Sequence, residues 1–165
     1  MATEAGLVSK AALVAIQQLF EELGSSLPVI VSAAVGSGGA TLISAQRIEA
    51  FWIAVRHIKP LAVGLNCCEG PDVLRPFVAE LAESVDCFTS CYPNAGLPNP
   101  LAPTGFDLEP HDMGEYMGEF AKSGLLNIAG GCCGNTPSHI AAIAESVKPH
   151  QPRIPQARTS NLSAR

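Results

Sequence analysis

The chain contains few aromatic and few charged residues, which make up 5% and 15% of its 165 residues. Scarce aromatic side chains weaken the case for base stacking. The net charge is −5 and the body of the chain has no basic stripe, which argues against a phosphate-backbone partner. We therefore expect no nucleic acid among its partners. Hydrophobic residues make up 47% of the chain, a globular rather than a disordered composition.

Two kinds of segment are also missing. The first residues carry Glu4 and lack a basic region followed by an apolar run, so no targeting segment is predicted. No uninterrupted apolar stretch reaches the length of a bilayer span. We expect a cytoplasmic protein with a core of its own and no membrane partner.

The six cysteines raise the question of a disulfide framework. Four of them form two adjacent pairs, Cys67-Cys68 and Cys132-Cys133, and neighbouring residues rarely bridge to one another because the bond geometry resists it. Without a secretion signal, clustered cysteines indicate metal binding or catalysis in a reducing compartment.

Helical and strand patterns alternate along the chain. Periodic apolar residues predict helices at 9–23, within 41–58, from Pro71, at 111–123 and from Pro137, and short apolar runs predict buried strands at 27–31, 61–65, 86–91 and 125–129. A long loop rich in proline and glycine fills 93–110. This alternation predicts an α/β fold with a parallel sheet, interpreted as a partial (β/α)8 TIM barrel of four units, although a small open sheet produces the same order.

The end of the chain has no periodicity. Residues 149–165 contain three arginines and no acidic residue. We expect one domain at 1–149 and a disordered, solvated tail at 150–165.

Three cysteines follow predicted strand ends. Cys67 comes after the second strand, and Cys132 and Cys133 come after the fourth. Because the carboxyl ends of parallel strands share one edge, these side chains can converge there. Three thiolates suit a catalytic zinc, which keeps its fourth position open. The helix expected after Thr136 points its positive end toward the pair, which favours the anionic thiolates.

Packing is the alternative interpretation of every cysteine. Cys87 and Cys91 lie within a predicted strand and are interpreted as core residues, and Cys68 is placed with them. For Cys132 and Cys133, in a glycine-rich turn, spacing alone leaves metal binding open against packing or redox chemistry. A redox or metal-storage protein needs a Cys-x-x-Cys motif or many clustered thiols, and Cys87 and Cys91 have a different spacing.

Several motifs resemble those of the homocysteine S-methyltransferase family, and the similarity extends from Lys10 to Pro149. The two that carry cysteines are Val63-Gly64-Leu65-Asn66-Cys67 and Gly130-Gly131-Cys132-Cys133-Gly134, the latter followed by Asn135-Thr136-Pro137. Two more resemble the cobalamin-dependent methionine synthases within that family: Tyr92-Pro93-Asn94-Ala95-Gly96-Leu97-Pro98-Asn99 and Leu19-Phe20-Glu21-Glu22-Leu23-Gly24.

The resemblance implies that residues 1–149 correspond to the C-terminal half of a homocysteine-binding (β/α)8 barrel. It implies an enzyme that activates homocysteine as a thiolate, which takes a methyl group from methylcobalamin to form methionine. Cys67, Cys132 and Cys133 are implied as ligands of Zn²⁺, with no further catalytic residue. Asn94 matches a position that can complete the zinc shell before substrate arrives, and its alternative is a turn residue that tolerates unusual dihedrals.

The sequence also departs from the family pattern. About four strand–helix units that begin the family barrel, and the folate and cobalamin domains, are expected to lie outside this chain. Cys68-Glu69 stand where small or apolar residues are usual, and Ser32-Ala33-Ala34 replace a more usual Ser-Gly-Thr. The alternative function is therefore a non-catalytic zinc-binding fragment. A half barrel leaves open parallel edges, so we expect a partner that is either the missing N-terminal half or a second copy of the chain.

Overall fold

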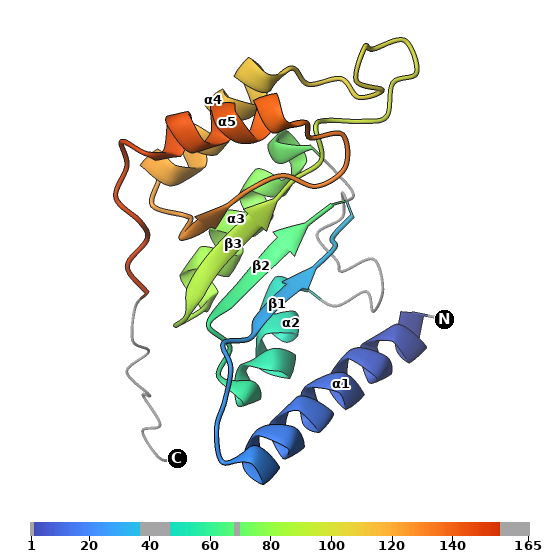
Figure 1. The fold of residues 1–165 in the computed structure, drawn as a ribbon, viewed down its shortest axis with the longest axis vertical. Helices are drawn as coiled ribbons and strands as arrows, with labels where there is room; N and C mark the ends of the chain where they lie inside the picture. The colour runs from blue at the N-terminus through green and yellow to red at the C-terminus, as the bar shows by residue number, and fades with distance from the viewer. Residues whose placement is uncertain (1, 37–46, 68–69, 156–165) are drawn as a thin grey trace.

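The computed structural model describes residues 2–36, 47–67 and 70–155. Helices and strands alternate within them, and four parallel strands form one sheet of order β1-β2-β3-β4 (Figure 1). The elements are α1 (Ala2–Leu23), β1 (Ile30–Ala33), α2 (Ile48–Val55), the 3-10 helix η1 (Arg56–Ile58), β2 (Ala62–Asn66), α3 (Pro71–Ser84), β3 (Phe88–Tyr92), α4 (Pro110–Lys122), β4 (Ile128–Ala129) and α5 (Pro137–Val147). The predicted α/β class with a parallel sheet is confirmed.

Helices cover one face of the sheet. Val63, Leu65 and Cys91 are fully buried in one core with residues of α2 and α3, which lie behind the sheet in Figure 1. Successive helices also contact one another from α2 to α5. A parallel sheet with its helices side by side along one face is the arrangement of a partial (β/α)8 barrel.

The opposite face of the sheet is partly open, although Ala62 and Ser90 are fully buried on it. Ile30 and Phe88 lie in register with Ala62 on this face, and their exposed fractions are 47% and 41%. Within the described residues, β1 and β4 each pair with one strand only. In a closed barrel this face lines the interior, so the structure presents an inner wall and two free edges.

The first elements differ from their predicted bounds. Helix α1 begins at Ala2 rather than at residue 9, because alanine and glutamate favour the helix. Strand β1 begins at Ile30 rather than at residue 27, because Pro28 has no N–H to donate to a ladder. The helix predicted within 41–58 is α2 followed by η1, and residues 41–46 lie outside the described residues. No helix in the described ranges is long and apolar enough to cross a bilayer.

The start of the predicted tail is ordered. Residues 150–155 are described, and only 7% of Arg153 is exposed. Its guanidinium donates hydrogen bonds to the carbonyl oxygens of Ala82, Val85 and Cys87, and its N–H donates to Leu126. Carbonyls at the end of α3 lack partners within the helix, so an arginine that donates to them anchors residues 150–155 to the fold. The predicted disorder is wrong for 150–155, and 156–165 lie outside the described residues.

Candidate metal centre

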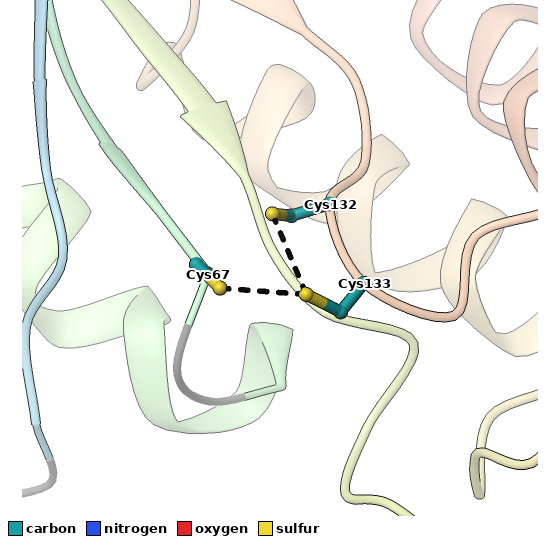
Figure 2. Close-up of side chains that lie close together, drawn as sticks. All are labelled: Cys67, Cys132 and Cys133. Carbon is teal, nitrogen blue, oxygen red and sulfur yellow. Dashed lines mark hydrogen bonds between the residues drawn. The ribbon is translucent and has the colours of Figure 1, made fainter.

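Cys67 follows β2 directly and has a left-handed backbone, with φ of 62°. This dihedral is unfavourable for a residue that carries a Cβ, so the surrounding structure has to hold it. The N–H of Cys67 donates to the carbonyl of Tyr92 at 2.9 Å, which continues the contact between β2 and β3. The turn brings the sulfur of Cys67 to the carboxyl edge of the sheet (Figure 2).

Cys132 and Cys133 lie in the turn between β4 and α5, and the β3–α4 loop (residues 93–109) holds this turn. The N–H of Cys132 donates to the carbonyl of Pro93 at 2.8 Å. The carbonyl of Cys133 accepts from the N–H of Ala95 at 2.9 Å. Backbone hydrogen bonds on both cysteines therefore hold the turn independently of any bound metal.

Glycines next to the pair make the turn possible. Gly134 has φ of 77°, and a Cβ there would collide with the ring of Phe106. A Cβ on Gly131 would collide with the side chain of Asn135. That side chain donates to the carbonyl of Pro93 at 3.0 Å, so Asn135 is part of the site although the sequence analysis assigned it no role. The glycine-rich motif thus provides both the backbone dihedral and the space for the turn.

The three thiols converge although they come from the ends of two different strands (Figure 2). The sulfurs of Cys67 and Cys133 are 3.5 Å apart, those of Cys132 and Cys133 are 3.9 Å apart, and all three lie within 4.8 Å of one another. A tetrahedral zinc with bonds of about 2.3 Å holds its sulfurs about 3.8 Å apart. The cluster has the dimensions of a three-thiolate zinc site. Cys133 is exposed and the other two are half-buried, so a fourth ligand can enter from solvent.

The thiol of Cys132 does not ionise easily. Burial, and after it the neighbouring sulfurs of Cys67 and Cys133, together raise its pKa to about 11. The positive end of α5 was expected to favour the anion of this thiol, but desolvation and two adjacent thiols have the larger effect. A cation bound among the three sulfurs would supply the positive charge that their ionisation needs.

Asn94 lies close to the cluster and is 6% exposed. Its Oδ1 accepts a hydrogen bond from the N–H of Cys133 at 3.0 Å. In this arrangement the amide oxygen holds the cysteine turn, as expected of a loop residue that binds backbone. A role as fourth metal ligand stays a prediction.

The remaining cysteines lie away from the cluster or outside the described residues. Cys91 is fully buried in the core, and burial raises its pKa to about 12. Cys87 is half-buried, packs against the core and also has a raised pKa, chiefly because of burial. Packing is therefore the role of both. Cys68 lies outside the described residues.

Sequence reasoning missed His139, which is fully buried near the start of α5. Its ring contacts Thr136 and the carbonyl of Leu108. The spacing of Thr136 and His139 matches a capping box, in which glutamate or glutamine usually fills the second position. That spacing was the available signal, and the unusual residue type concealed it.

The fold and the site together define a partial (β/α)8 barrel with a thiol cluster at the carboxyl ends of its strands. The family described as homocysteine S-methyltransferase matches residues 6–147 of the sequence. The match spans most of the chain, and the chain belongs to the homocysteine S-methyltransferase family. The resemblance seen in the cysteine motifs is thereby confirmed.

Among solved structures, the chain is similar to the crystal structure of the homocysteine methyltransferase MmuM from Escherichia coli in its oxidised form. The TM-score is 0.59 at 17% sequence identity, and the alignment covers 82% of this chain and 41% of the relative's chain. At this identity the likeness establishes the fold alone. The chain spans less than half of the relative's length.

Proposed function

We propose that this chain binds Zn²⁺ through Cys67, Cys132 and Cys133 and activates homocysteine as a thiolate for methyl transfer. The observation that carries the proposal is the convergence of three sulfurs within 4.8 Å of one another in a member of this family. Thiolates are soft donors that suit zinc, and three of them leave one position for a substrate thiol.

Each part of the site then has a chemical task. Bound zinc would lower the pKa of the incoming thiol while leaving its sulfur nucleophilic. The β3–α4 loop holds the cysteine turn, and the exposed side of Cys133 is where the substrate enters. In the transfer, the homocysteine sulfur forms a bond to the methyl carbon, the donor keeps the electron pair of the broken bond, and the thiol proton leaves to solvent.

The finer parts of the proposal rest on motif similarity. We propose methylcobalamin as the methyl donor because residues 92–99 resemble the cobalamin-dependent branch of the family. We propose residues 1–149 as the C-terminal half of the homocysteine-binding barrel. Asn94 would reach the metal only after its Oδ1 releases the N–H of Cys133.

Metal analysis tests the proposal first. We expect about one zinc per purified chain, and loss of that zinc when Cys67, Cys132 or Cys133 is replaced by serine. Cys87→Ala is the matched control, because this half-buried thiol lies outside the cluster and its loss should leave the zinc in place. A protein that stays metal-free after reconstitution with Zn²⁺, with all of its thiols still reduced, would contradict the proposal.

A zinc-binding fragment without turnover is the second candidate function. Two observations favour it: the chain covers 41% of its structural relative, and the inner face of its sheet is open. An assay of zinc-loaded protein with methylcobalamin and homocysteine separates the candidates. Production of methionine that disappears in Cys133→Ser supports the enzyme, and bound zinc without methionine supports the fragment.

A further inference from the structure

His139 joins the beginning of α5 to the far end of the β3–α4 loop. Its Nδ1 lies 3.2 Å from the backbone nitrogen of Thr136 and 2.8 Å from the hydroxyl oxygen of the same residue. Its Nε2 lies 2.9 Å from the carbonyl oxygen of Leu108. The ring is fully buried, so water does not compete for these contacts.

These contacts determine where the ring carries its proton. The backbone N–H of Thr136 can only donate, so Nδ1 accepts and is unprotonated. The carbonyl of Leu108 can only accept, so Nε2 carries the proton and donates it. His139 is therefore a neutral imidazole in a single tautomer. An imidazolium would set a second N–H against that of Thr136.

From Leu108 the hydrogen bonds continue to the cysteine turn. The N–H of Leu108 donates to the carbonyl of Ala95 at 3.0 Å, and the N–H of Ala95 donates to the carbonyl of Cys133 at 2.9 Å. The N–H of Cys133 donates to Oδ1 of Asn94 at 3.0 Å. These bonds run from His139 to Cys133, and the backbone between these two residues completes a closed ring. The ring contains the turn that presents the Cys133 sulfur.

We propose that His139 is a positioning residue for the metal centre. Its neutral ring holds the β3–α4 loop against the cysteine turn and thereby sets the separation of the Cys133 and Cys67 sulfurs. This inference rests on the proposed function, because the role is defined by metal binding. Groups that orient metal ligands change metal affinity by about 10- to 100-fold when they are lost. A helix cap alone would affect stability and leave the sulfurs of the folded protein in place.

Metal affinity of the full chain provides the test, with Co²⁺ as a spectroscopic probe and Zn²⁺ in competition. His139→Ala removes all three ring contacts, two with Thr136 and one with Leu108. The matched control is Ile143→Ala, one turn further along α5, where the side chain is 2% exposed and belongs to the core. We expect His139→Ala to lower the affinity for Zn²⁺ and for Co²⁺ about tenfold or more. We expect Ile143→Ala to keep the wild-type affinity for both. Equal affinities in these two folded variants would overturn the inference.

Two further measurements apply even where His139→Ala does not fold. His139→Gln offers one acceptor and one donor in place of the ring nitrogens, so we expect it to keep most of the wild-type affinity. In ¹⁵N spectra of the wild type, we expect one histidine with protonated Nε2 and bare Nδ1 whose signals shift on Zn²⁺ binding. Weak binding by His139→Gln, a protonated Nδ1, or signals indifferent to Zn²⁺ would each overturn the role. Failure of the wild type itself to bind metal contradicts the proposed function instead, and the ring spectra still report the His139 contacts.

Discussion

Cys67 combines a metal-ligand side chain with a backbone conformation that favours glycine. Its φ of 62° lies in the left-handed region, and one hydrogen bond to Tyr92 helps to hold it there. Strained dihedrals of this kind persist where the surrounding structure over-determines them, often at functional sites. The conformation that places the sulfur therefore costs stability in the metal-free chain.

A pair of substitutions at this position measures that cost. Cys67→Gly and Cys67→Ala both remove the thiol, so both should lose zinc. Glycine relieves the left-handed strain, and we expect the metal-free Cys67→Gly protein to be more stable than Cys67→Ala by about 1 kcal/mol. Urea unfolding of the two variants measures the difference. Equal stabilities would show that the dihedral carries no strain.

Protonation of Cys132 makes metal binding dependent on pH. Its pKa is raised to about 11 by burial and by the adjacent thiols, so the metal-free site holds this proton at neutral pH. Binding has to displace it, and the apparent zinc affinity should rise with pH by up to about tenfold per unit for each thiol that is still protonated. Chelator competition between about pH 6 and about pH 8 measures the slope. A flat affinity over that range contradicts thiolate ligation by Cys132.

At the scale of elements, the sequence predicts the middle strands of the sheet better than β4, whose two residues form only part of the predicted segment 125–129. Strands β2 and β3 lie where apolar runs place them, because buried parallel strands are continuous hydrophobic segments. Cys67 follows β2 and Cys133 follows β4, and because both are parallel strands of one sheet, the two cysteines fall at the same edge. The contacts of His139 and Arg153 could not be predicted, because both depend on carbonyl groups brought near by the tertiary fold.

Arg153 connects the segment after α5 to the end of α3. Replacement by methionine would leave the carbonyls of Ala82, Val85 and Cys87 without this donor, and we expect a loss of about 2–3 kcal/mol in the free energy of unfolding. The matched control is Arg75→Met. Arg75 pairs with a glutamate on α4 at 2.9 Å with 39% of its side chain exposed, so its loss should cost less than about 1 kcal/mol. Chemical denaturation that ranks the two variants equally would contradict the anchoring role of Arg153.

At the scale of the whole molecule, the open face of the sheet is the dominant feature. Ile30 and Phe88 expose apolar surface there, and both edge strands have a free side within the described residues. Unpaired edges beside exposed apolar side chains favour association with another chain. Four units of a barrel and a small open sheet have the same sequence pattern, because closure of a barrel requires strands beyond these four.

We expect the isolated chain to self-associate at micromolar concentration. Phe88→Thr should weaken this association by removing apolar surface from the open face. Leu101→Thr should leave it unchanged, because Leu101 is 94% exposed in the loop between β3 and α4 and belongs to no strand of the sheet. Size-exclusion chromatography with light scattering measures the oligomeric state. A stable wild-type monomer at these concentrations would count against the prediction.

The convergence of Cys67 and Cys133 has a consequence for chain entropy. These residues are 66 positions apart, so one ion held by both acts as a cross-link that closes a long loop. A cross-link of that span removes conformations from the unfolded chain worth about 4 kcal/mol in the loop-closure treatment of disulfides. Chelation should therefore lower the melting temperature and speed hydrogen exchange across β3, which lies inside the loop, and β2, which ends next to it. Metal removal that leaves both unchanged would mean that the ion does not bridge the two strand ends.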